Sequence, residues 1–404
     1  MNKKEVTEIK KQFTPSNCAI TRICGCYVDG EKEKKTEMKD AFLSLPEEEM
    51  FKYFDIFRKS LSGTIGKNLL NMEFPLETES EGGTQEFLLK LRNSRLTDDA
   101  LLEEFYNRVI DSYDYAENYL ILLVHAAYDI PGKSTDGSEM FDASDEVYDY
   151  IMCTFCPVKL SKPGLSYHAE ENSFHECIRD WIVEMPDAGF LFPAFNDRST
   201  DIHNLLYYSK NAENLGNGLT DLLLGCVPPL TAGNQKDTFR TLIEETLGDD
   251  CDYDTVKNIH ENLNEMIEQN SENPEPLALD KAEVKYLLAK SGVEEEKLET
   301  FDEQYDSAAG EHSTLLASNI ANLKKFEIKT PDITIQVNPE CSYLVETRII
   351  DGQKCLVIVV DDRVEINGIS AKTAVSGGLP KSSTPDASDE SKSDTSENEM
   401  DVPF

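Results

Sequence analysis

The centre of the chain carries three nearly continuous apolar runs of strand length, YLILLVHAAYDI (119–130), Tyr148–Leu160 and Gly189–Phe195. A strand that is apolar along its whole length, rather than at alternate positions, is typical of a sheet covered on both faces. The segments between these runs hold no long crossover helix, which parallel pairing would need. We therefore predict a sheet-rich centre with antiparallel strands, and an α+β fold in which helices flank this sheet.

Apolar residues at spacings of three and four predict helices on both sides of this centre. Residues 19–39 differ, because the turn pair Asp29–Gly30 lies between stretches rich in β-branched and aromatic residues, so we expect a two-stranded ribbon there. The helices are expected within 2–13, from Pro46 onward, and over 85–92, 98–113, 219–224, 236–247 and 254–269.

The polar, Pro-containing stretch QNSENPEP (269–276) predicts a linker between an N-terminal α+β domain, 1–268, and a C-terminal domain, 277–370. The C-terminal domain should open with two helices in the order of a helix-turn-helix, the first starting at a capping box of Asp280 and Glu283. A small antiparallel sheet with a hairpin at Asp351–Gly352 should follow. Residues 371–404 contain almost nothing apolar, and we expect this acidic, serine-rich tail to be disordered.

The chain has 404 residues, with 77 Asp and Glu against 39 Lys and Arg, a formal net charge of -38. This balance excludes a protein that binds nucleic acid or anionic lipid through bulk positive charge. The second helix of the helix-turn-helix pair is also acidic, so it cannot enter a DNA groove productively. A local basic island remains, and its candidates are Lys3, Lys4, Lys10 and Lys11. We expect direct nucleic-acid binding to be absent or weak.

The apolar run Leu120–Val124, closed by His125, is far shorter than the roughly 20 residues that span a bilayer. The first residues, MNKKEVTEIKKQF, lack the apolar stretch of a secretory signal. We therefore expect a soluble, cytoplasmic protein without membrane contact. Its ten cysteines should stay reduced in that compartment.

A zinc site could draw on Cys153, Cys156, His168, His175 and Cys177, which supply enough ligands. A chelating pair of cysteines needs both thiolates on one side of a turn. Cys153 and Cys156 lie inside a predicted strand instead, where residues three apart point to opposite faces. We predict buried thiols and loop histidines, with no bound metal or cofactor.

The segment NDRSTDIH (196–203) is the first candidate for a catalytic site. It follows an apolar run and brings Asp197, Arg198, Asp201 and His203 together beside Asn196, a set that could serve phosphodiester or acyl chemistry. A turn at the end of a strand has the same composition, because Asn, Asp and Ser hydrogen-bond to their own backbone. No spacing of nucleophile and base is recognisable. We favour the turn and keep the catalytic role as the alternative.

Two long strings resemble a known family. NKKEVTEIKKQFTPSNCAITRICGCYVDG, and KPGLSYHAEE followed by WIVEMPDAGFLFPAFNDRSTDIHNLLYYSKN, are similar to a bacterial family called domain of unknown function 4317. This resemblance covers about residues 1–370 and implies no activity, ligand or catalytic residue. More distantly, the order of elements over 280–368 is similar to the C-terminal part of bacterial nucleoid-associated proteins, which implies association with the chromosome.

These features predict a non-enzymatic binding or assembly protein that could join a nucleoid or other nucleic-acid complex through partner proteins. The alternative is a hydrolase or nuclease that uses the cluster Asn196–His203. An enzyme needs this cluster to converge with His168, His175 or Glu170 in one concave pocket. A binding module should instead show an exposed apolar patch or a free sheet edge.

Overall fold

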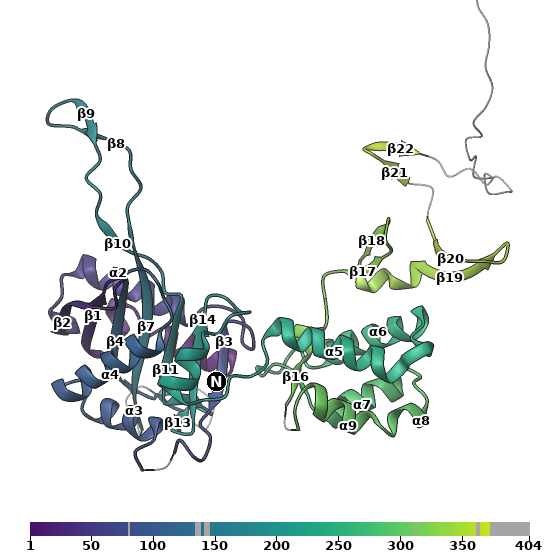
Figure 1. Cartoon of the computed structure of the whole chain (residues 1–404), viewed down its shortest axis with the longest axis horizontal. Helices are drawn as coiled ribbons and strands as arrows, with labels where there is room; N and C mark the ends of the chain where they lie inside the picture. The colour runs from purple at the N-terminus through teal and green to yellow at the C-terminus, as the bar shows by residue number, and fades with distance from the viewer. Residues whose placement is uncertain (80, 134–138, 141–145, 312, 361–363, 372–404) are drawn as a thin grey trace, which may run out of the picture. The chain divides into compact units, whose positions relative to one another are not determined.

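The structure is a computed structural model that describes residues 1–79, 81–133, 139–140, 146–311, 313–360 and 364–371 (Figure 1). By its contacts the chain divides into two compact units, Met1–Ser342 and Tyr343–Phe404. The prediction of a disordered tail falls almost wholly on 372–404, which lie outside the described residues. The predicted α+β class is confirmed by a large antiparallel sheet with helices packed against it.

The large sheet has eight strands in the order β2-β1-β4-β7-β11-β14-β3, with β10 paired to β7 outside this path. Every pairing is antiparallel, as the lack of crossover helices between the apolar runs predicts. The strands are β1 (Ile20–Val28), β2 (Lys34–Ala41), β3 (Leu69–Glu73), β4 (Tyr119–Asp129), β7 (Val147–Leu160), β10 (Trp181–Val183), β11 (Ala188–Phe192) and β14 (Asn204–Ser209).

Strand β7 shows why the central strands are apolar throughout. Side chains alternate along a strand, so Cys153 and Phe155 enter one core, while Met152 and Cys156 enter another. The first core is closed by α3 (Thr84–Asn93), α4 (Asp99–Ser112) and the π-helical segment η3 (Gly218–Leu224). The second core is closed by α1 (Lys3–Lys10) and α2 (Glu47–Ser60). The sheet is therefore the middle layer of three.

Local sequence signals set the ends of the flanking helices. Pro46 precedes α2, whose first turn is acidic and whose last turn holds Arg58 and Lys59, the order that the helix dipole favours. The side chain of Asp98 accepts hydrogen bonds from the backbone N–H groups of Ala100 and Leu101 at the start of α4. The predicted helices from Pro46 and over 98–113 are confirmed.

A third core is built by helices from both sides of the stretch 269–276. Leu263 on α6 and Leu287 on α7 both contribute to it, and the division of the chain lies at 342/343 rather than here. A polar loop with proline has the same composition whether it joins two domains or two helices of one core. Composition therefore led the prediction to place a domain boundary at 269–276, where the structure has a loop within one unit. The helices are α5 (Ala232–Leu247), α6 (Tyr253–Gln269), α7 (Lys281–Lys290), α8 (Glu295–Leu298), α9 (Phe301–Ala308) and α10 (Ala317–Ile320).

The predicted capping box of Asp280 and Glu283 is present at the start of α7. The single acidic helix expected after Gly292 is instead two short helices, α8 and α9, interrupted at Glu299–Thr300. The predicted hairpin at Asp351–Gly352 is confirmed, with φ angles of 51° and 79° at these two residues.

The remaining strands form small antiparallel pairs, and those near the C-terminus are separate hairpins rather than one sheet. They are β5 (Gly132–Lys133) with β6 (Glu139–Met140), β8 (Leu165–His168) with β9 (Ser173–Glu176), β12 (Ala194–Asn196) with β13 (Ser199–Asp201), β15 (Ala278–Leu279) with β16 (Leu315–Leu316), β17 (Phe326–Lys329) with β18 (Thr334–Val337), β19 (Val345–Ile350) with β20 (Gln353–Ile358), and β21 (Val364–Ile366) with β22 (Ile369–Ala371). Short 3-10 turns are η1 (Pro15–Asn17), η2 (Phe42–Ser44), η4 (Gly248–Asp250) and η5 (Pro339–Leu344).

Candidate functional site

A two-stranded arm, residues 159–185, projects from the large sheet (Figure 1). It starts at the end of β7, beyond the part of this strand that pairs within the sheet. Residues 151–155 of β7 pair with β11, whereas residues 158–160 pair only with β10. The hairpin of β8 and β9 forms its tip. No segment between 161 and 180 is buried, so the arm is free to meet another molecule.

The arm exposes an unusual number of large apolar side chains. Eight of them lie within residues 165–185, with exposed fractions from 38% to 80%. A soluble monomer seldom shows so many together, and such patches mark binding sites. They are Leu165, Tyr167, Phe174, Ile178, Trp181, Ile182, Val183 and Met185, and Trp181 is the single tryptophan of the chain.

The tip of the arm has two chemically different faces. Tyr167 lies directly across from Phe174, with ring centroids 5.4 Å apart, and Leu165 shares their face because it is two residues from Tyr167. The opposite face carries His168 and His175, whose ring centroids are 5.1 Å apart. An apolar face and a polar face on one hairpin allow it to bind a groove in a single orientation.

The charge of the arm limits what it can bind. Its acidic residues are five, Glu170, Glu171, Glu176, Asp180 and Glu184, against three basic residues, Lys159, Lys162 and Arg179. One basic residue is already paired within the arm, since the Lys159 ammonium lies 3.2 Å from the Glu184 carboxylate. An acidic arm is repelled by anionic lipid and by nucleic acid.

Sequence reasoning missed the arm. The signal that could have found it is the alternation of single apolar and polar residues in LSYH (165–168), with a shorter alternation in SFH (173–175), close to the lone tryptophan. Alternation over four residues is typical of a half-exposed strand. It is too short to stand out beside the long apolar runs.

The structure does not bring together the five residues considered for zinc. Cys153 lies in the first core and Cys156 in the second, on opposite faces of β7, whereas His168, His175 and Cys177 belong to the arm. Burial raises the pKa of Cys156 to about 12 and raises that of Cys153 as well, so both thiols stay protonated. A zinc thiolate would require the opposite shift.

The segment 196–203 forms the hairpin of β12 and β13, with Asp197 and Arg198 as its two-residue turn at φ angles of 51° and 56°. The Arg198 guanidinium lies 3.0 Å from the Glu8 carboxylate on α1. The Asn196 amide donates to Asp201 Oδ2 at 2.7 Å, and its oxygen accepts from the Met1 amino group. These polar groups therefore hold the start of the chain against the sheet.

The two ionisable residues at the end of this segment are also engaged. Burial would raise the pKa of Asp201, but hydrogen bonds from Asn196 and Asn204 outweigh it, so the pKa is lowered. His203 Nδ1 lies 2.5 Å from Glu79 Oε1, and this contact raises the pKa of the exposed imidazole. Both groups have structural partners on neighbouring segments.

The cluster 196–203 does not converge with the histidines of the arm. Phe195 packs on Tyr148 at the start of β7, with ring centroids 4.7 Å apart, and the arm leaves from the other end of that strand. β7 has 14 residues, so at about 3.3 Å per residue its ends lie about 40 Å apart. One pocket cannot contain Asp201, His203 and His168.

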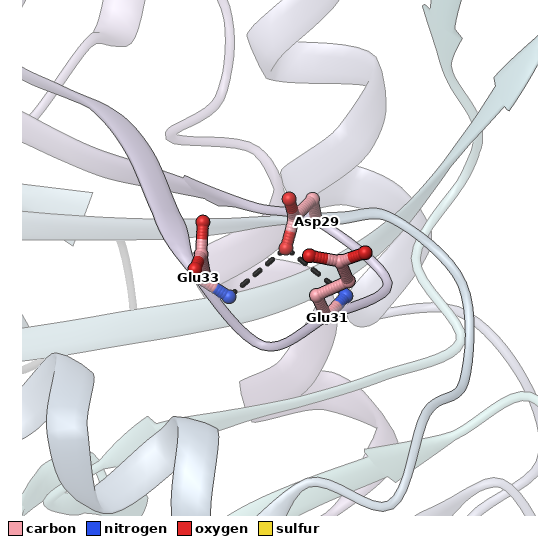
Figure 2. A group of neighbouring side chains, drawn as sticks. All are labelled: Asp29, Glu31 and Glu33. Atoms are coloured by element: carbon pink, nitrogen blue, oxygen red, sulfur yellow. Dashed lines mark hydrogen bonds between the residues drawn. The ribbon is translucent and has the colours of Figure 1, made fainter.

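A turn between β1 and β2 gathers three carboxylates (Figure 2). Carboxylate oxygens of Asp29, Glu31 and Glu33, one from each, lie within 4.8 Å of one another. Among the described residues, no other group of three His, Cys, Asp or Glu side chains brings its possible metal-ligand atoms so close together. Asp29 Oδ1 accepts hydrogen bonds from the backbone of Glu31 and Glu33, and the Lys35 ammonium lies 2.7 Å from both Asp29 and Glu33. Lys35, followed by the Glu33 backbone, lowers the pKa of Asp29. The ammonium of Lys35 therefore supplies the positive charge that this turn needs.

His125 on β4 is a buried imidazole that contributes to pH-dependent stability. It is 1% exposed, its Nδ1 lies 2.7 Å from Thr21 Oγ1, and its Nε2 lies 3.7 Å from Asp149 Oδ1. Burial lowers the pKa of His125, and the nearby Asp149 offsets only part of that shift. The folded protein therefore holds this ring neutral.

We predict that the free energy of unfolding falls as the pH drops below about 6.5, the pKa of an unfolded histidine. Below that pH the unfolded chain binds a proton that folded His125 does not, so protonation favours unfolding. A His125→Asn variant keeps a side chain that can bond to Thr21 and should lose less stability than the wild type between pH 7.5 and pH 5.5. Urea unfolding at both pH values measures this, and equal losses in the two proteins would contradict it.

Two comparisons with known proteins bear on the chain as a whole. A family model described as "Domain of unknown function (DUF4317)" matches residues 1–369, a range that contains the large sheet, the arm and all three cores. A search of curated proteins found no match. In the part of the chain that the structure describes, no helix is both long enough and apolar enough to cross a membrane.

Proposed function

We propose, for a chain that belongs to the family described as domain of unknown function 4317, a non-enzymatic role in binding and assembly. The arm, residues 159–185, is the binding element. The observation that carries this proposal is its eight exposed large apolar side chains on a hairpin that leaves the body of the fold. Burying such side chains against a partner removes apolar surface from water, at about 25 cal/mol per Å².

The partner that fits this arm is a protein with an apolar groove and a basic rim. The groove would take Tyr167 and Phe174, and the rim would face the acids at the tip, such as Glu170 and Glu171. Charge complementarity of this kind steers association and selects the partner. Because the chain carries -38, we propose that any place in a nucleoid or other nucleic-acid complex is reached through this protein partner.

The proposal places the protein in the cytoplasm. All ten cysteines are free thiols, as expected for a reducing compartment. Direct contact with nucleic acid would have to use a local basic island. Burial, followed by the nearby cations Arg58 and Lys59, lowers the pKa of Lys10, but Arg58 is already paired with Asp55 at 2.6 Å. Such an island supports only weak, salt-sensitive binding.

The alternative role as a hydrolase or nuclease has less support. Asn196, Arg198 and His203 are hydrogen-bonded or ion-paired to structural neighbours, and the arm histidines lie toward the far end of β7. A catalytic base must reach its substrate with a free lone pair. The engaged residues of this hairpin favour a structural role.

The test compares partner capture by the wild type and by a Tyr167→Ser/Phe174→Ser double variant in native cells. Each protein is purified by affinity, with and without nuclease treatment, and the bound protein is identified and then purified for a direct binding measurement. We expect one protein to bind the wild type after nuclease treatment, and its affinity for the double variant to be at least about tenfold lower, because two buried aromatic side chains are lost.

The matched control is Leu222→Ser, on η3. Leu222 is 69% exposed and Phe174 is 68% exposed, so the control replaces one large apolar side chain that is as exposed as Phe174 but lies outside the arm. It should bind the partner as the wild type does. Equal binding by the wild type, the double variant and the control would mean that the arm is not the binding element.

A further inference from the structure

The second unit contains hairpins but no core of its own in its described part. Residues 343–360 and 364–371 form the pairs β19–β20 and β21–β22, and none of them belongs to the three hydrophobic cores. An isolated two-stranded hairpin is at best marginally stable in water. A hairpin of this kind gains stability when another strand extends it.

The outer edge of β20 is apolar and unprotected. The run CLVIVV (355–360) contains no charge, no Pro and no Gly, and Ile358, Val359 and Val360 are 45–50% exposed. Within the described residues, β20 pairs only with β19. The edge strand of the large sheet, β2, is different, because its sequence KKTEMKDA has charges at five of eight positions. Charged edges prevent pairing between molecules, whereas long apolar edges invite it.

The register of the hairpin shows which backbone groups point outward. Asp351 and Gly352 form a two-residue turn, so Ile350 and Gln353 are the hydrogen-bonded pair that closes it. Hydrogen-bonded and non-hydrogen-bonded pairs alternate from there. The backbone N–H and C=O groups of Lys354, Leu356 and Ile358 therefore face away from β19.

We propose that β20 pairs antiparallel with β20 of a second copy of this chain, about a two-fold axis at Val357. This register sets Leu356 opposite Ile358 of the second copy. The backbone N–H and C=O groups that face away from β19 in one copy therefore meet the same kind of groups in the other. The result is a four-stranded sheet in the order β19-β20-β20-β19, in which residues 355–359 of the two copies pair and Val360 of each copy lies opposite Lys354 of the other. A two-fold axis makes the two contacts identical and closes the assembly at a dimer.

Charge favours the antiparallel over the parallel orientation of the two copies. Two chains of -38 each repel, so they can approach only through an uncharged segment. The antiparallel register places the two Lys354 side chains six residues apart along the sheet, about 20 Å, whereas parallel pairing would set them about 5 Å apart. The contact does not involve the arm, so this inference stands independently of the proposed function.

The first test measures the mass of the full-length protein by sedimentation across a range of concentrations and salt. We expect a dimer whose affinity rises with salt, because salt screens the repulsion between the acidic chains. Leu356→Pro removes one outward N–H, a position where an edge strand tolerates proline, and should weaken the dimer at least about tenfold. Leu356→Ala removes the side chain but keeps that N–H, and should weaken the dimer less.

The second test is cross-linking, which reads the register directly. With Cys355→Ser in the background, Val357→Cys places two thiols at the axis in a non-hydrogen-bonded pair, where Cα atoms are about 4.5 Å apart and a disulfide can form. Mild oxidation with diamide should link Val357→Cys into dimers. The control Ile350→Cys, on β19, should not link. A protein that is monomeric at every concentration would overturn the proposal. So would a dimer that persists in Leu356→Pro and in which Val357→Cys forms no disulfide.

Discussion

Cutting the arm back to a tight turn should abolish partner binding while leaving the melting temperature within about 2 °C of the wild type. Leu160 and Trp181 lie directly opposite each other, so replacing residues 161–180 with Asn-Gly closes the ribbon with a two-residue hairpin turn. The removed segment contributes to none of the three cores. The partner would lose Leu165, Tyr167, Phe174 and Ile178 in one step.

Thermal unfolding and a binding titration with the purified partner measure the two halves of this prediction. A control chain with the same residues 161–180 in scrambled order keeps the length and charge of the arm but not the apolar face of its tip, and it should also fail to bind. A fall of many degrees in the melting temperature would show that the arm stabilises the fold. Full binding by the shortened chain would contradict its role as the binding element.

Phe155→Ala should lower the free energy of unfolding by about 3–5 kcal/mol. Phe155 is fully buried in the first core, and its ring centroid lies 5.3 Å from that of Tyr113. It sits on β7, which pairs with both β4 and β11. The substitution leaves a cavity between the sheet and the helices that cover it, and the neighbouring side chains cannot fill a space of this size.

Val147→Ala, on the same strand, is the matched control. Val147 is 53% exposed, so its truncation should change the free energy of unfolding by no more than about 0.5 kcal/mol. Urea unfolding of both variants measures the difference. Similar losses in the two would mean that β7 is not the buried centre of the sheet.

The central sheet and several turns could be predicted because their signals are local and strong. The long apolar runs identify β4 and β7, and Asp351–Gly352 and the capping box at Asp280 are short patterns with a direct physical cause. The edge strand β3 and its neighbour β14 could not be predicted in the same way. Each has only five or six residues, and its place in the sheet depends on long-range pairing that no local pattern records.

The candidate site was harder to predict, because composition does not separate structural from functional polar groups. NDRSTDIH has the residues of an active site, yet Arg198 is ion-paired with Glu8 and Asn196 accepts a hydrogen bond from Met1. These partners lie at the start of the sequence, far from the segment itself. The arm has the opposite difficulty. Tyr167 and Trp181 look like ordinary buried aromatics in the sequence, whereas both are exposed on the arm in the structure.

The arm contains the most direct probe of the proposal, because Trp181 is the single tryptophan of the chain and is 56% exposed. Protein labelled with 5-fluorotryptophan should give one fluorine NMR signal, from Trp181. This signal reports on binding of the purified, unlabelled partner, because the partner's own tryptophans carry no fluorine. We expect this signal to shift and broaden as the partner is added, and to lose its sensitivity to solvent exchange between H2O and D2O. A signal that stays unchanged while the partner binds would contradict the account of the arm as the binding element.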